Sequence, residues 1–260
     1  MKRTVTLVLA VALALSMTGC EALDAILNVN LFSSMAAVKA ADIEGADAGT
    51  LLELSASPSF YAALSGSPST KTSALATIDG ALGGSLPPAT EQELLALAAE
   101  IELRTTPAWD LVNNIGSLLS KLISGEPIDE ANLENVIRGI LPDSVLGAGG
   151  VINETAFLSM IAGLELAYLR YDDLGNAIGT GGYADGSDVI AGDIAQSAIV
   201  AAMVATIARP VSYGGTQTTG AYLYALLLGT ADPPDTFDFD AMTSVPSLAN
   251  ILSAAGISFS

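Results

Sequence analysis

The chain has 260 residues, of which 51% are hydrophobic and 14% are charged, and its formal net charge is −19 with no histidine. A surface this acidic repels the phosphates of DNA and RNA, which argues against nucleic acid as a partner. Without histidine, the Ser-His-Asp and Cys-His catalytic centres and the commonest general base are excluded.

The first twenty residues follow the order of charged, apolar and small residues that is typical of a secretory signal. Lys2 and Arg3 precede an apolar run over 5–15, which is shorter than the roughly 20 residues that a membrane-spanning helix needs. The run is followed by small residues and ends in Met17-Thr18-Gly19-Cys20. This ending resembles the lipobox of bacterial lipoproteins, with methionine where leucine is commoner. The alternative is an ordinary buried cysteine in a first helix.

The resemblance to bacterial lipoproteins implies a lipid anchor at Cys20. In that family the cysteine thiol receives a diacylglyceryl group, the signal peptide (residues 1–19 here) is removed, and the new amino group is usually fatty-acylated, as with palmitate. Two or more chains hold a protein stably on a bilayer. In that family Glu21, rather than aspartate, after the cysteine favours the outer membrane. Removal of the two basic residues of the signal would change the net charge from −19 to −21.

Beyond the cysteine, the hydrophobic pattern is helical nearly throughout. Apolar residues recur at spacings of three and four, and Ser-Pro pairs, Thr106-Pro107 and a capping box over 90–93 mark helix starts. In chain order, we expect helices over residues 21–40, 59–64, 70–82, 90–104, 108–124, 129–140, 153–171, 187–208, 218–228 and 247–255.

This pattern predicts an all-α fold, either an irregular multi-helix bundle or an array of helical hairpins. Residues 20–260 would form one acidic domain, or two subdomains that meet near 142–152. Residues 171–176 match one unit of a tyrosine–aspartate repeat, but such proteins need many copies, so we interpret them as a helix end and a turn. The most apolar stretch, 198–208, is too short to span a bilayer.

Tyrosines gather in the last third of the chain, where six of the seven lie within 57 residues around a glycine-rich segment. Tyrosine joins an apolar ring to a polar tip, which suits ligand pockets and interfaces, although the edge of an ordinary core uses it in the same way. The candidate ligand-binding or partner-binding residues are Tyr168, Tyr171, Tyr183, Tyr213, Tyr222 and Tyr224.

Two acidic loops carry candidate ligands for a hard cation. Their carboxylates suit Ca²⁺, but neither loop fits the EF-hand pattern, and aspartate and glycine also form caps and turns. The candidate ligands are Asp173, Asp185 and Asp188 in the first loop and Asp235, Asp238 and Asp240 in the second. We expect no cofactor, with Ca²⁺ as the one ion that these loops would suit.

No familiar catalytic constellation is visible. A Ser-x-x-Lys dyad is absent at all three lysines of residues 20–260, and paired acids, though frequent, need a sugar cleft to act as a glycosidase. We therefore expect a non-catalytic binding or scaffold lipoprotein of the bacterial envelope, with a protein partner or an apolar ligand. The alternatives are a tethered hydrolase that uses carboxylates, and a helical accessory lipoprotein of a solute transporter, which the chain resembles in broad architecture only.

Overall fold

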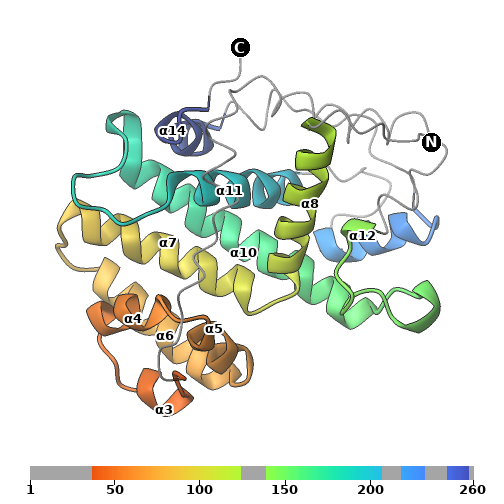
Figure 1. Cartoon of the computed structure of the whole chain (residues 1–260), viewed down its shortest axis with the longest axis horizontal. Helices are drawn as coiled ribbons and strands as arrows, with labels where there is room; N and C mark the ends of the chain where they lie inside the picture. Colours follow the sequence, from red (N-terminus) through yellow and green to blue (C-terminus); the bar gives the residue numbers. More distant parts are fainter. Residues whose placement is uncertain (1–36, 124–138, 207–217, 232–244, 258–260) are drawn as a thin grey trace.

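The computed structural model describes residues 37–123, 139–206, 218–231 and 245–257, and within these ranges the regular structure is helical (Figure 1). The predicted all-α fold is therefore confirmed. Cys20 lies outside the described residues, as do most of the helices expected over 21–40 and 129–140. In the described parts of the chain, no helix is both long enough and apolar enough to cross a bilayer.

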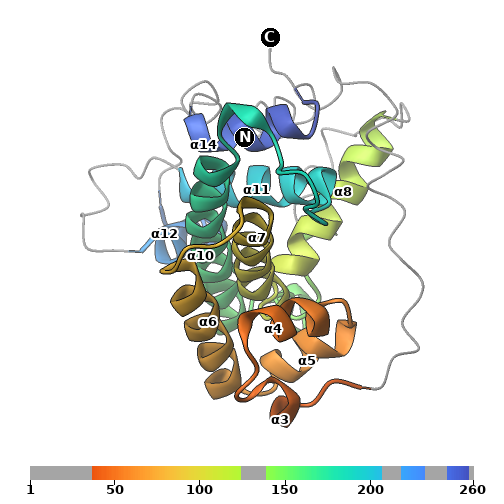
Figure 2. The same cartoon turned by 90° about the vertical axis from the view of Figure 1, so that its left-hand side faces the viewer.

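Four helices form an N-terminal layer, drawn in orange to brown in the lower part of Figure 2. They are α3 (Ala40–Ile43), α4 (Ala48–Ser55), α5 (Pro58–Ser65) and α6 (Pro68–Leu82). Prolines begin α5 and α6 as expected, because a first helical residue needs no N–H donor. The sequence analysis missed α3 and α4, although Asp47 caps α4 by accepting a hydrogen bond of 2.8 Å from the Thr50 amide.

Helix α7 (Pro88–Arg104) is the central helix of the molecule, since both of its faces are buried. One face, which includes Leu94 and Ile101, joins a hydrophobic cluster with the N-terminal layer, which we call the N-terminal cluster. The opposite face, which includes Leu95 and Leu103, joins a larger cluster built by the later helices, the main cluster. Because α7 belongs to both clusters, it ties the N-terminal layer to the rest of the fold.

The later helices gather around a long helix, α10 (Glu154–Ile178), which packs against α7. Helices α11 (Ala191–Ala205), α12 (Thr219–Leu227) and α14 (Pro246–Ala254) also contact α10, and α8 (Ala108–Ile123) leaves from the end of α7 (Figure 1). The loop residues Leu141 and Val145 are buried in the main cluster. The suggested subdomain boundary near 142–152 stays a prediction.

The interpretation of residues 171–176 as a helix end and a turn is wrong, because α10 continues to Ile178. Tyr171, Leu174 and Ile178 are buried at helical spacing in the main cluster. Burying a large apolar side chain contributes about 1.5–3 kcal/mol, which outweighs the roughly 1 kcal/mol that a helical glycine such as Gly175 costs.

The capping box expected at Thr90 is also wrong, because α7 begins two residues earlier, at Pro88. Glu93 instead accepts a hydrogen bond of 2.9 Å from the amide of Asp188, in the segment that links α10 to α11. Helix α11 begins at Ala191, later than the start at 187 or 188 that the sequence pattern predicts.

Candidate functional site

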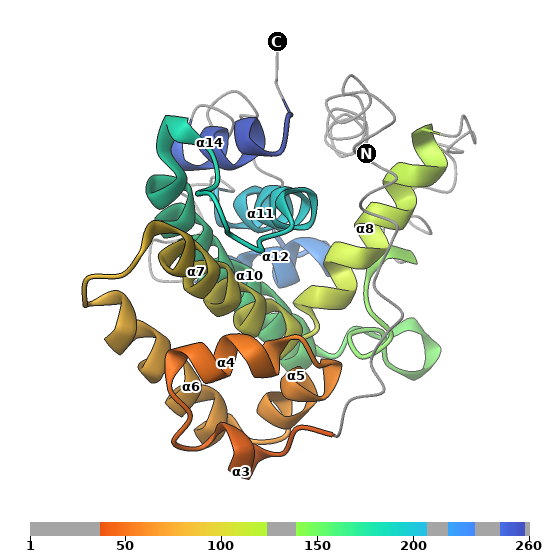
Figure 3. The same cartoon turned by 60° about the vertical axis from the view of Figure 1, so that its left-hand side comes forward.

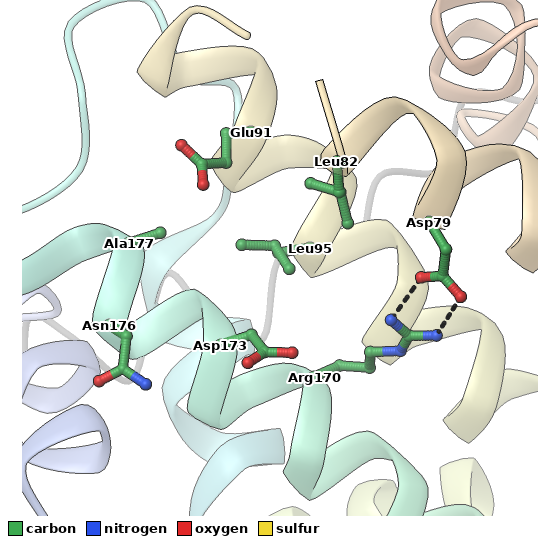
Figure 4. A pocket seen from close by; sticks show the side chains of 9 residues that line it. Asp79, Leu82, Glu91, Leu95, Arg170, Asp173, Asn176 and Ala177 are labelled. Carbon is green, nitrogen blue, oxygen red and sulfur yellow. Dashed lines mark hydrogen bonds and ion pairs between the residues drawn. The ribbon is translucent and has the colours of Figure 1, made fainter. Parts of the chain in front are cut away.

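A cavity of about 550 Å³ opens to solvent between α6, α7 and α10 (Figure 4). Its walls carry carboxylates, one guanidinium, one amide and two leucines. The lining residues are Asp79, Leu82, Gly83, Glu91, Leu95, Arg170, Asp173, Asn176 and Ala177. We call this feature the α6–α7–α10 cavity.

One side of the cavity is fixed by a bidentate ion pair between α10 and α6. Arg170 donates from Nη1 to Asp79 Oδ1 at 2.6 Å and from Nη2 to Oδ2 at 3.0 Å. The hydrogen bonds with Asp79 raise the pKa of Arg170, so this guanidinium stays charged. Two parallel hydrogen bonds also fix the relative orientation of the two helices. The charge of Asp79 is therefore already balanced within the protein.

The remaining acids of the cavity are Glu91 and Asp173. Their carboxylates have no hydrogen-bond or ion-pair partner in the described part of the chain, although Asp173 acts electrostatically on Arg170. In Figure 4 the side chain of Leu95 lies between them. The cavity therefore combines an apolar patch with two carboxylates that have no hydrogen-bond or ion-pair partner among the described residues, an arrangement that suits a cation with an aliphatic stem.

The tyrosines proposed from the sequence are mostly packing residues of the core. Tyr171 and Tyr222 are buried, and Tyr168, Tyr183 and Tyr224 are partly buried and pack against the main cluster. Burial raises the pKa of Tyr183 to about 12, so its hydroxyl stays neutral at physiological pH. Tyr213 lies outside the described residues. None of the described tyrosines lines the α6–α7–α10 cavity, and their binding role stays a prediction.

The proposed calcium ligands are placed only in part. Asp173, Asp185 and Asp188 are exposed, and Asp235, Asp238 and Asp240 lie outside the described residues. Within the described ranges, no three histidine, cysteine, aspartate or glutamate residues are grouped so that they could hold a metal ion. The structure thus does not bring the first three aspartates together as a cation site.

Sequence analysis missed a second polar group, centred on Arg104 at the end of α7. The Arg104 guanidinium lies 4.7 Å from the ring centroid of Tyr61 and 4.1 Å from that of Trp109. Glu100 accepts a hydrogen bond of 2.5 Å from the Tyr61 hydroxyl and one of 3.4 Å from Arg104. Only the spacing of four between Glu100 and Arg104 was visible in the sequence, because the rings come from α5 and α8.

Asp193, in the first turn of α11, carries a carboxylate whose pKa is influenced by the charges of this group. Burial raises its pKa above the usual range, the charge of Glu100 raises it further, and Arg104 opposes both effects. The neighbouring tyrosine hydroxyls stay neutral, since burial raises the pKa of Tyr61 and of Tyr171. We call Tyr61, Glu100, Arg104 and Trp109 the Arg104 junction.

No protein-family model, curated protein or solved structure matches this chain. A fold hosts many functions, so function has to be inferred from the chemistry of the sites themselves. The α6–α7–α10 cavity is accessible from solvent, whereas the Arg104 junction is filled by its own side chains. The cavity is therefore the better candidate for a binding site.

Proposed function

We propose that this chain is a lipid-anchored, non-catalytic binding component of the bacterial cell envelope, and that the α6–α7–α10 cavity receives a basic side chain of a partner protein. The lipobox-like ending at Cys20 supports the anchor and, with Glu21, an outer-membrane location. The observation that carries the binding role is the pair of carboxylates, Glu91 and Asp173, on either side of Leu95, which have no hydrogen-bond or ion-pair partner among the described residues. A lysine would place its ammonium between the acids and its methylenes on the leucine.

Such a contact is weak in solution, and the anchor would compensate for this weakness. Exposed ion pairs contribute about 0.2–1 kcal/mol each, so two carboxylates alone cannot hold a dilute partner. A partner confined to the same membrane has a much higher effective concentration, which strengthens binding without any new contact. The cavity and the Cys20 anchor thus support one another in this proposal.

The two alternative functions receive less support from the structure. A carboxylate hydrolase would need a raised-pKa acid beside a substrate cleft, and Asp193 meets the first requirement. However, neither Asp193 nor Glu100 lines the cavity, and Glu100 is hydrogen-bonded to Tyr61. An accessory protein for an apolar ligand would need a mainly apolar pocket, whereas charged residues line this one.

The proposal is tested by carbodiimide cross-linking in native membranes, because this reagent joins a carboxylate to a nearby lysine amine. We expect mass spectrometry to find Glu91 or Asp173 joined to a lysine of one recurring partner. The double variant Glu91→Gln/Asp173→Asn should lose this partner when the complex is captured without cross-linking, because the cross-link itself needs the carboxylates. A matched variant, Glu53→Gln/Glu154→Gln, removes two exposed carboxylates outside the cavity and should retain it.

Two results would contradict the proposal. If the cavity variant and the matched variant capture the same partner in the same yield, the cavity is not the binding site. If a Cys20→Ala variant is still processed and still fractionates with membranes, the anchor is wrong. In the second case, a partner cross-linked to Glu91 would still support the cavity as a binding site.

A further inference from the structure

Two leucines of α10 are exposed beside the α6–α7–α10 cavity. Leu166 is 46% exposed and Leu169 is 58% exposed, although the other large apolar side chains of this helix are mostly buried. Single exposed apolar residues are normal on a protein surface. These two lie three positions apart, so their side chains are neighbours on one face of the helix. We call this pair the α10 leucine patch.

The α10 leucine patch continues into the cavity. Asp173, which lines the cavity, follows Leu169 by four positions and Leu166 by seven. This spacing places the three exposed side chains in one row along the helix. At a rise of about 1.5 Å per residue, the row is about 10 Å long. The surface therefore offers apolar contact and negative charge in line over about two helical turns.

The helices that pack against α10 contact other faces of it. Helix α7 runs alongside α10 (Figure 3). On one side Arg170 joins α10 to Asp79 of α6, and on the other the backbone of α12 at Gly220 lies against Ile161. Arg170 and Ile161 are nine positions apart, which at about 100° per residue places them on opposite sides of the helix. The row lies between these two contacts and is exposed along its length.

Charge decides which kind of occupant suits this surface. Asp173 and Glu91 have no hydrogen-bond or ion-pair partner among the described residues, whereas Arg170 is bonded to Asp79. The cavity end of the row therefore attracts a basic side chain. A second copy of this chain would bring 28 acidic residues and only 9 basic ones, and an anionic lipid surface would be repelled as well. A basic segment of another protein fits better than either.

We propose that the partner presents its basic side chain from an amphipathic helix, which lies along α10 with apolar residues on the α10 leucine patch and a lysine in the cavity. This inference rests on the proposed function, because it names the structure of the same partner. A row of side chains on one helix is matched by residues three and four positions apart on a second helix. An extended segment fits less well, because α10 offers no free strand edge with which its backbone could pair.

Photo-cross-linking of the full chain in native membranes tests this arrangement. A diazirine-bearing amino acid placed at position 169 should link to the same partner that carbodiimide joins to Glu91 or Asp173. Mass spectrometry should find the two linked residues of the partner within four positions of each other, as neighbours on one helix are. A diazirine at position 228, which is also an exposed leucine, is the matched control and should not reach that segment.

Two double variants measure what the α10 leucine patch contributes. Leu166→Gln/Leu169→Gln should lower capture of the partner without cross-linking by about tenfold, because two leucines then lose apolar contact. Leu227→Gln/Leu228→Gln removes two exposed leucines of α12 and should leave capture unchanged. The control lies away from the patch, because α12 runs towards the start of α10, where Tyr224 packs against Phe157.

The outcomes separate this inference from the proposed function. If carbodiimide joins a partner to the cavity but the diazirine at position 169 does not reach the segment around the linked lysine, the cavity still receives a basic side chain and the helical arrangement is wrong. Links from position 169 to lipid or to a second copy of this chain would name those occupants instead. Equal capture by the two leucine variants would also overturn the inference. If carbodiimide finds no partner at the cavity, the proposed function fails and this inference fails with it.

Discussion

A Cβ atom added to Gly175 would lie 2.1 Å from the backbone oxygen of Ser247 and 2.5 Å from its carbonyl carbon. Neither backbone atom can move without displacing the start of α14. Two hydrogen bonds lie in the same contact region. The side-chain Nδ2 of Asn250 donates to the backbone oxygen of Gly175 at 3.0 Å, and the Ser247 hydroxyl donates to Asp172. The glycine is therefore what allows α14 to approach α10 this closely.

We predict that Gly175→Ala destabilises the protein by about 2–4 kcal/mol, because overpacking against backbone costs 1–3 kcal/mol or more and loosens the polar contacts of α14. Gly80→Ala is the matched control, since Gly80 lies in α6 with nothing within 4 Å of an added Cβ. It should stabilise the protein by roughly 0.5–1 kcal/mol. Urea unfolding measures both. Equal effects of the two substitutions would show that α14 does not pack on Gly175 in solution.

At the residue scale, the helices expected from residues 153 and 218 begin one residue later, as α10 and α12. Asn153 and Thr218 cap them, since each accepts a hydrogen bond from a backbone amide three residues later. The role of Gly175 was not predictable, because its constraint comes from Ser247, 72 positions further along the chain. A helix start can be predicted from neighbouring residues, whereas a close approach between distant segments cannot.

At the scale of elements, Gln92 shows how α7 positions the segment between α10 and α11. This side chain is 2% exposed. Its Oε1 accepts a hydrogen bond of 2.8 Å from the Ala184 amide, and its Nε2 donates one of 3.4 Å to the Ala177 oxygen. Residue 177 lies in α10 and residue 184 in the link that follows, so one side chain fixes the point at which the chain leaves the helix.

We predict that Gln92→Leu, which keeps a similar volume, costs about 1–3 kcal/mol, because it leaves the Ala184 amide without its partner. Hydrogen exchange at Ala184 should become faster than in the wild type. Glu93→Gln retains an oxygen for the Asp188 amide and should leave exchange at that residue nearly unchanged. If exchange at Ala184 does not change in Gln92→Leu, this hydrogen bond does not hold the segment.

The helix boundaries show the same limit of local information. The Ser-Pro starts of α5 and α6 were predicted correctly, since proline at the first helical position is a local preference. The capping box at Thr90 was wrong because α7 begins at Pro88, and Glu93 accepts instead from the Asp188 amide in the segment between α10 and α11. The end of α10 was wrong because Leu174 and Ile178 are buried against helices from later in the chain. Tertiary contacts therefore decide where α10 ends.

At the scale of the whole molecule, helical periodicity was sufficient to predict the fold class but not the candidate site. The cavity needs Asp79 from α6, Glu91 from α7 and Arg170 from α10, three helices whose arrangement no periodicity specifies. Its acidic residues also do not stand out in the sequence, because the chain has 28 acidic residues and acids on exposed helix faces are common. The tyrosines were chosen because six of them lie close together in the sequence, yet most of those described pack in or against the core.

The excess of acid is a property of the whole chain, and it sets how stability responds to salt. With 28 acidic and 9 basic residues, the folded state brings like charges closer together than the unfolded chain does. Three of the basic residues, Lys71, Arg104 and Arg170, already pair with carboxylates. Repulsion among the remaining acids is screened by dissolved ions. We predict that NaCl raises Tm at neutral pH by about 2–4 °C for each kcal/mol of repulsion relieved.

The same salt series at about pH 4 distinguishes screening from other effects of salt, because many of the carboxylates are then neutral. Screening needs charge to act on, so the rise in Tm with NaCl should be much smaller in acid than at neutral pH. Exclusion of ions from the protein surface, by contrast, strengthens apolar burial whatever the state of the carboxylates. An equal rise at both pH values would therefore assign the stabilisation to exclusion, and the acidic surface would then impose no measurable cost on folding.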